Sequence, residues 1–192
     1  MKFIPIAITA AALAALSTPA AGQMGASASY EFVKAVRDRN GGKAQELLRS
    51  NPPGILNAKD DDGNTALIIA VSREDQDWTA FLIKQGADVN LPGRGGETPL
   101  IAAARSGFED AVDWLLGDGA KIDGTNKMGE TPLIVAVQLR NARLVKMLLD
   151  AGANPDKPDS AAGLSARDYA ARDTRSRQIL QLIEAKKPKP AR

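Results

Sequence analysis

Three consecutive aspartates at positions 60–62 precede Gly63, and carboxylates beside a glycine are typical of calcium-binding loops. When Gly63 is placed at loop position 6, however, positions 1 and 12 fall on Ala58 and Ile69. Two carboxylates that such a loop needs are therefore missing. We interpret this stretch as a polar β-turn and predict no metal ligand in it.

The glycine-rich stretch Pro92–Gly96 could in principle surround a phosphate group with backbone N–H groups. A phosphate loop would continue with Gly-Lys-Ser/Thr and would follow a buried strand, and neither pattern is present. The stretch is therefore interpreted as a second turn, at the same place in a repeated pattern.

Catalytic chemistry has few candidate residues, because the chain contains no histidine and no cysteine. Imidazole acid–base catalysis, thiol nucleophiles and the commonest zinc ligands are thereby excluded. The carboxylates are scattered over polar helix surfaces. We predict no catalytic residue, no metal and no cofactor. An enzyme or ligand-binding protein with a hidden carboxylate site stays open, and a deep pocket with converging, pKa-shifted acids would favour it.

The strongest signal is an internal repeat. Nearly the same eight-residue sequence occurs three times at intervals of 33 residues, at Gly63–Ala70, Gly96–Ala103 and Gly129–Ala136. A diverged copy follows 34 residues later, at Gly163–Ala170. Self-similarity at a fixed period of this length predicts an array of stacked units.

Each regular unit has the markers of two helices. A threonine precedes the first helix as its N-cap, and proline follows in two units at the position where its missing N–H costs nothing. The threonines are Thr65, Thr98 and Thr131. A second helix ends in a Gly-Ala pair, where glycine supplies the left-handed conformation after the C-cap. The glycines are Gly86, Gly119 and Gly152.

This unit of helix, turn, helix and hairpin loop resembles the ankyrin repeat, whose marker is Thr-Pro-Leu-His-x-Ala. One departure is consistent: the marker's histidine is replaced by Ile68, Ile101 and Ile134. The resemblance implies an all-α ankyrin-repeat solenoid of about five units with degenerate terminal caps. The expected repeats are 30–60, 61–93, 94–126, 127–160 and 161–185.

The terminal units depart from the pattern. The first aligns only with a period of 35 and has lost the Thr-Pro-Leu text, as a capping unit can. In the last, Arg167 and Asp168 stand where leucine and the marker's histidine would be. We expect this face of the last unit to be exposed.

The N-terminus has a secretory pattern: Lys2, then an apolar run, then small residues up to Gly22. We interpret 1–22 as a signal peptide, with cleavage after Ala20 or Gly22. An uncleaved anchor is the weaker alternative, because the run of about 14 residues is shorter than the roughly 20 that span a bilayer. Residues 23–29 are predicted to be a flexible lead-in.

The signal pattern and the absence of cysteine together favour the bacterial periplasm, with secretion from the cell as the alternative. The basic, proline-broken residues 186–192 are expected to be disordered. We expect a monomer without stable membrane insertion after cleavage, and no nucleic-acid partner.

Resemblance to ankyrin repeats implies that a protein partner contacts the concave side, at the hairpin tips and first helices. At the tips these positions are Asp61, Asp62, Asn64, Arg94, Glu97, Lys127, Met128 and Glu130. On the helices they are Arg37, Arg73, Arg105, Gln138, Leu139 and Arg172. The arginines on the helices would form a broken row, and we predict that it meets an acidic patch on the partner.

Overall fold

A computed structural model describes residues 21–51 and 53–186, and in that part of the chain all regular structure is helical. The α-helices are α1 (Ala21–Arg37), α2 (Gly41–Ser50), α3 (Ala66–Ser72), α4 (Gln76–Lys84), α5 (Pro99–Ser106), α6 (Glu109–Gly117), α7 (Pro132–Gln138), α8 (Ala142–Asp150), α9 (Ala166–Arg172) and α10 (Arg177–Ala185). Three short 3-10 helices join them: η1 (Pro53–Asn57), η2 (Arg94–Gly96) and η3 (Thr174–Ser176).

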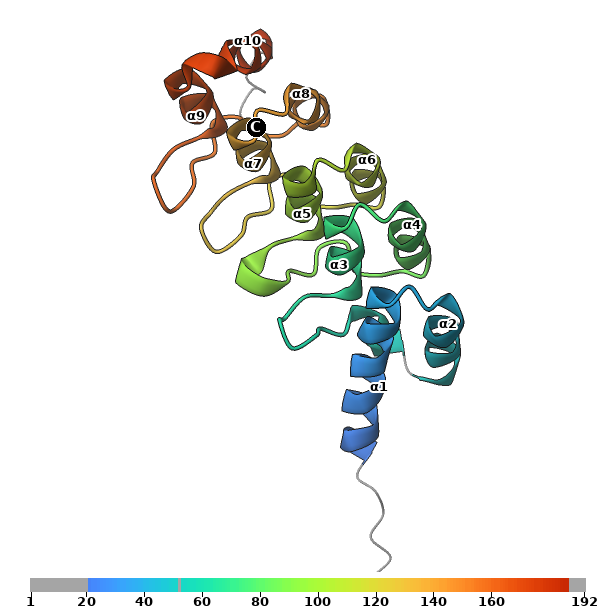
Figure 1. Ribbon diagram of the computed structural model, residues 1–192. Helices are drawn as coiled ribbons and strands as arrows, with labels where there is room; N and C mark the ends of the chain where they lie inside the picture. The colour runs from blue at the N-terminus through green and yellow to red at the C-terminus, as the bar shows by residue number, and fades with distance from the viewer. Residues whose placement is uncertain (1–20, 52, 187–192) are drawn as a thin grey trace, which may run out of the picture.

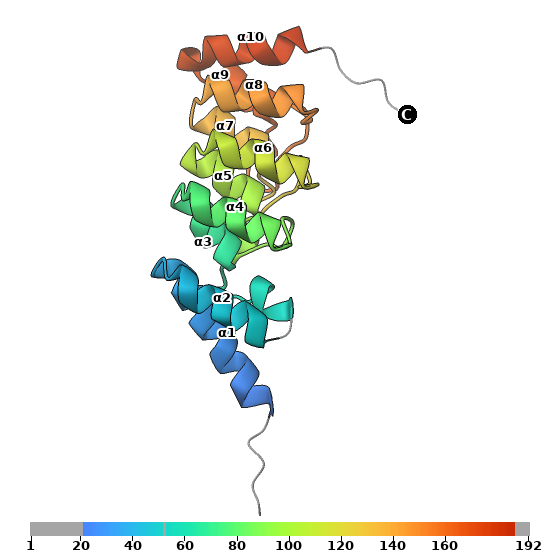
Figure 2. The same ribbon diagram turned by 90° about the vertical axis from the view of Figure 1, so that its right-hand side faces the viewer.

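The helices form two columns, as Figures 1 and 2 show. The odd-numbered helices pack on one another in the order α1, α3, α5, α7, α9, and each packs on the even-numbered helix that follows it. The loops between units project from the odd-numbered side (Figure 1). The predicted all-α solenoid of five helix pairs is confirmed.

The predicted caps form as expected. The hydroxyl oxygens of Thr65, Thr98 and Thr131 each accept a 3.2 Å hydrogen bond from the backbone N–H three residues later. Each bond satisfies a donor that the first helical turn leaves without a partner. Because the caps recur every 33 residues, all three helices begin at the same position within their repeats.

The core lies between the two columns. Leu67, Leu100 and Leu133 are buried, and the small residues Ala70, Ala103 and Ala136 are buried in phase with them. A side chain without bulk beyond Cβ lets neighbouring helices approach closely, so each layer covers the apolar side of the next.

The isoleucines that replace the histidine of the marker are also buried. Ile68 packs so closely on the next tip that a β-carbon at Gly93 would lie 2.7 Å from its Cδ1 atom. Adjacent tips are also joined by backbone bonds: Lys127 N–H donates to the Gly95 carbonyl at 2.9 Å, and Ser160 N–H donates to that of Met128 at 2.8 Å. Apolar packing and backbone pairing thus link the loops without an imidazole.

Each tip closes with a backbone bond instead of a regular strand pair. Gly93 N–H donates to the Glu97 carbonyl at 2.8 Å, and Asn126 N–H donates to the Glu130 carbonyl at 3.2 Å. In the last tip the bond runs from Asp159 to Leu164. That tip therefore holds one more residue, which accounts for the final step of 34 in the sequence.

The N-terminal prediction needs a correction. Helix α1 begins at Ala21, so residues 23–29 are helical and not the flexible lead-in that the sequence suggested. The apolar periodicity that marks a helix begins only at Phe32, and residues 23–29 have no such periodicity. The proposed signal peptide, apart from Ala21 and Gly22, and the tail after Lys186 lie outside the described residues.

The last repeat is an exposed cap, as predicted for Asp168. Its carboxylate accepts from the backbone N–H of Ser165 at 2.9 Å, while the Ser165 hydroxyl accepts from the Asp168 N–H at 3.2 Å. This capping box replaces the threonine cap of the regular units. Arg167 is half-buried and pairs with Asp156 at 2.6 Å.

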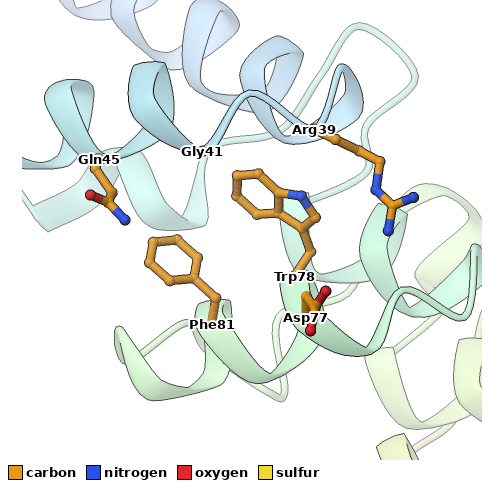
Figure 3. A pocket seen from close by; sticks show the side chains of 6 residues that line it. All are labelled: Arg39, Gly41, Gln45, Asp77, Trp78 and Phe81. Carbon is orange, nitrogen blue, oxygen red and sulfur yellow. The ribbon is translucent and has the colours of Figure 1, made fainter.

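The even-numbered column is less continuous. Helices α4 and α6 pack closely, as do α8 and α10, whereas α2 with α4 and α6 with α8 make fewer contacts. A cavity of about 210 Å³ lies between α2 and α4, lined in part by Gly41, Trp78 and Phe81 (Figure 3). The two aromatic rings meet edge to face, with their centroids 5.5 Å apart.

Candidate protein-interaction face

The inner face is defined here as the tips together with the exposed side of α1, α3, α5, α7 and α9. All predicted contact residues lie on the tips or at the carboxyl ends of these helices, and all except Glu130 are exposed or half-buried. Eleven of the fourteen fall into three groups along the stack, and Asp61, Arg94 and Arg172 are exposed outside these groups.

The first group surrounds a hollow of about 230 Å³ beside α1 and α3. The guanidinium group of Arg37 forms an ion pair with Asp60, whose side chain is only 6% exposed. Arg73 Nη1 donates a 2.7 Å hydrogen bond to the carbonyl oxygen of Arg37. The hollow also contains Asp62 and Asn64, so it gathers four of the predicted residues.

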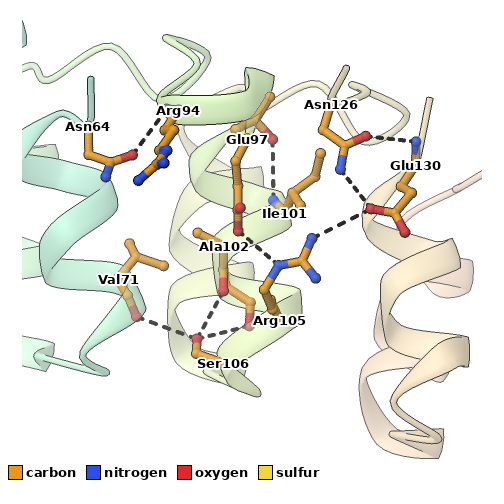
Figure 4. Close-up of polar contacts among 12 residues, drawn as sticks. Asn64, Val71, Arg94, Glu97, Ile101, Ala102, Arg105, Ser106, Asn126 and Glu130 are labelled. Carbon is orange, nitrogen blue, oxygen red and sulfur yellow. Dashed lines mark hydrogen bonds and ion pairs between the residues drawn. The ribbon is translucent and has the colours of Figure 1, made fainter. Parts of the chain in front are cut away.

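The second group is centred on Arg105 (Figure 4). Its Nε atom lies 3.1 Å from the Glu97 carboxylate, and its Nη2 atom lies 3.6 Å from that of Glu130. Asn126 Nδ2 donates to the Glu130 carboxylate at 2.7 Å. This network joins two consecutive repeats with side chains that the sequence assigned to a partner.

The burial of Glu130 corrects the predicted site at this position. The residue is 7% exposed, and its backbone N–H donates to Asn126 Oδ1 at 3.0 Å. A carboxylate held by two internal partners stabilises the tip and offers little surface to another protein. Phase predicted the position of Glu130 but not its burial.

The third group is the most apolar part of the inner face. Met128 and Leu139 are 53% and 52% exposed, and with Tyr30 they are the most exposed large hydrophobic residues of the described chain. Lys127, at the same tip as Met128, and Gln138, beside Leu139, are also exposed. A protein that covered these apolar side chains would gain free energy by removing them from water.

The arginine row is present but less positive than the sequence indicates. Arg37 and Arg105 are paired with carboxylates of the same chain, which cancels their charge locally. Within residues 21–51 and 53–186, Arg73 and Arg172 have no ion pair. The available positive charge is thus at two positions instead of four.

Sequence reasoning missed the residues that shape the tips. Asp60, Asn126 and Asp159 recur in phase, and their side-chain oxygens accept from backbone N–H groups of their own turns. The 33-residue recurrence of Asp or Asn was a usable signal. Gly93 stands at the equivalent position in the second tip and has no side chain to accept a hydrogen bond. In that tip the Arg94 N–H donates instead to Oδ1 of Asn64, from the preceding tip, at 3.1 Å.

The acidic groups with shifted pKa values do not resemble an acid–base site. Burial disfavours the charged form of Asp159, but hydrogen bonds from Tyr169 and from backbone N–H groups outweigh it and lower its pKa. The hydrogen bond from Arg140 lowers the pKa of Asp173 to about 2, and that from Lys146 does the same for Asp150. Each acid has its own partner, and each shift is opposite to the one a general acid at neutral pH requires.

The described part of the chain contains no group of three or more metal-ligating side chains close enough to hold an ion. Its helices also lack the combination of length and hydropathy that crossing a membrane requires.

Comparison with known families identifies the class of protein. The family described as "Ankyrin repeats (3 copies)" matches residues 32–126 and, in a second overlapping match, residues 95–159. The chain therefore belongs to the ankyrin repeat family, whose members are in general protein-interaction modules without enzymatic activity. Comparison with curated proteins found no match.

Proposed function

We propose that this protein is a non-enzymatic interaction module of the bacterial periplasm that binds a protein partner on its inner face. Membership of the ankyrin repeat family supports the interaction role. The observation that carries the choice of face is the exposure of Met128 and Leu139 among polar residues on the side where the tips project. Apolar side chains that are covered in a complex supply much of its free energy.

The proposed location rests on the N-terminal sequence, in which a lysine, an apolar run and small residues follow one another. Cell fractionation tests it. The mature protein, shortened by about 20 residues, is expected in the periplasmic fraction. Recovery in the culture medium would favour the alternative, a secreted effector that acts on host proteins. Recovery of an unshortened chain in the cytoplasm would contradict both.

Site-specific photo-crosslinking in intact cells tests the binding face. A photoreactive residue at Met128 or at Leu139 is expected to capture the same envelope protein. The matched control is Arg143 on α8, whose side chain is 79% exposed in the even-numbered column. Capture from Arg143 alone, or equal capture of the same protein from all three positions, would contradict the proposal.

A further inference from the structure

The arginines of the inner face are not equivalent. Arg37 and Arg105 are each neutralised by a carboxylate of their own chain. Arg73 and Arg172 have no such partner in the described residues, and of these two only Arg73 has its guanidinium group fixed by a hydrogen bond to another part of the fold. Arg73 is therefore the one arginine of the row that is held in place without a carboxylate partner in the described residues.

The contact that holds Arg73 leaves most of its binding capacity unused. Its Nη1 atom donates at 2.7 Å to the carbonyl oxygen of Arg37, the last residue of α1. A guanidinium group carries five N–H donors and keeps its charge when it donates to a neutral carbonyl. Because the side chain is already ordered, binding a carboxylate would cost less conformational entropy than at a free surface arginine.

The surroundings of Arg73 suit a single carboxylate. The hollow of about 230 Å³ contains Asn64 and Ser72 as further polar groups. Asn64 Oδ1 already accepts from a backbone N–H, which leaves its NH₂ group as a donor. The hollow is lined by two arginines and two aspartates; Asp60 pairs with Arg37, and Asp62 lies 3.8 Å from Arg94 on the next tip, so Arg73 is the lining arginine without a carboxylate partner in the described residues.

We infer that this hollow binds the carboxylate of a glutamate or aspartate side chain on the partner protein, with Arg73 as the anchor. The inference rests on the proposed function, because it specifies the chemistry of the partner at the same face. An internal side chain is favoured over a chain terminus because the inner face continues beyond the hollow along the whole stack (Figure 1). The partner chain can therefore run past Arg73 in the direction of Met128 and Leu139.

Nuclear magnetic resonance of the arginine Nε–Hε groups provides a direct test in the absence of a known partner. Propionate, which reproduces a glutamate side chain, is titrated at constant low ionic strength, with propionamide as the neutral control. The Arg73 signal is expected to shift and saturate with a dissociation constant on the order of 10 mM, as suits one charge-assisted contact. The Arg37 and Arg105 signals are expected to move much less. Equal shifts at all three arginines, or none at Arg73, would overturn the inference.

Two peptides distinguish the sources of the carboxylate. Acetyl-Gly-Glu-Gly-amide carries it only on a side chain, whereas acetyl-Gly-Gln-Gly carries it only at the C-terminus. The first is expected to shift Arg73 at least about threefold more strongly than the second at equal concentration, because a terminus would have to end inside the hollow. The opposite order would overturn the choice of a side chain.

The variant Arg73→Gln is expected to abolish the propionate response, and Arg73→Lys is expected to keep a weaker one because lysine lacks the planar fork. Unchanged amide spectra outside the hollow verify that both variants fold. Crosslinking separates this inference from the proposed function. If Arg73→Gln leaves capture from Leu139 unchanged, Arg73 does not anchor the partner, but the inner face is still supported as the binding face. If Leu139 captures no protein in the unmodified chain, the proposed function itself fails.

Discussion

The side-chain oxygen of Asn90 accepts a 2.8 Å hydrogen bond from the backbone N–H of Lys121, which belongs to the next repeat. Asn57 and Asp123 make the same contact, each with an N–H group 31 residues further on. The three residues recur at intervals of 33 and form a ladder that ties successive repeats together. The ladder is separate from the contacts between the tips.

Replacing Asn90 tests the ladder. Asn90 Nδ2 also donates to the Gly119 carbonyl at 3.1 Å, so the variant Asn90→Ala loses both contacts. We expect it to lower the free energy of unfolding by about 1–3 kcal/mol, and Asn90→Asp, which keeps an acceptor, to cost about half as much. Urea unfolding followed by circular dichroism measures both. Equal losses would show that the acceptor contributes nothing.

A hydroxyl group buried in α4 leads to a stabilising substitution. Thr79 is fully buried, and its Oγ1 atom has no hydrogen-bond partner in the described residues. Val112 and Val145 occupy the same place in the next two repeats and are also buried. We expect Thr79→Val to raise the free energy of unfolding by about 1 kcal/mol, because it removes an unsatisfied polar group.

The control for this substitution is Val112→Thr, which places a hydroxyl in an equivalent apolar environment. It is expected to lower the free energy of unfolding by about 1–3 kcal/mol in the same urea titration. A loss of stability with Thr79→Val would indicate that the hydroxyl finds a partner in solution.

Two glycines separate backbone strain from steric overlap. Gly129 and Gly152 both have φ in the left-handed region, at 79° and 94°. A β-carbon at Gly152 would meet nothing within 4 Å, whereas one at Gly129 would overlap the backbone of Asp159 and Ser160. We expect Gly152→Ala to cost about 1 kcal/mol and Gly129→Ala about 1–3 kcal/mol more. Thermal unfolding of the two variants side by side measures the difference, and equal melting temperatures would contradict it.

Acid is expected to weaken the C-terminal repeats. Asp150 and Asp173 have a pKa of about 2 in the folded protein, below the ordinary value of 3.8. A carboxylate with a lowered pKa stabilises the fold fully above its unfolded pKa, and that contribution is lost as pH falls through the folded value. The melting temperature should therefore be flat above about pH 5 and decline between about pH 4 and pH 2.

The variant Asp173→Asn checks the origin of this decline. It should be less stable than the unmodified protein at pH 7, and the difference should shrink as the pH falls toward 2, where Asp173 is neutral in the unfolded state and about half protonated in the folded state. The side chains of Asp173 and Arg140 are both partly exposed, so added salt should reduce the stability difference between the two proteins. A difference between the two proteins that does not change with pH would exclude the ion pair with Arg140 as its cause.

The fold was largely predictable from the sequence because its determinants are local and repeat in phase. The caps at Thr65, Thr98 and Thr131 and the helix-ending glycines each depend on a few neighbouring residues. The start of α1 was not predictable in this way, because residues 23–29 carry no apolar periodicity. A helix can extend through such a segment without leaving a pattern.

The inner face was predictable in position and not in chemistry. The repeat phase placed Arg73 and Arg105 at exposed positions near the carboxyl ends of α3 and α5, but it could not show that one contacts a carbonyl and the other two carboxylates. These pairings depend on side-chain conformations across repeat boundaries. For the same reason the burial of Glu130 became visible only in three dimensions.

The unequal packing of the two helix columns has a mechanical consequence. The odd-numbered helices pack on one another continuously, whereas the even-numbered column is interrupted. Such a stack resists stretching along the continuous column and bends about it. One such interruption lies beside Trp78, between α2 and α4, where a tilt of the first helix pair would meet less resistance than in the continuous column. That tilt would change the width of the hollow at Arg73, which lies at the same junction, and would let it adjust to the segment that enters it.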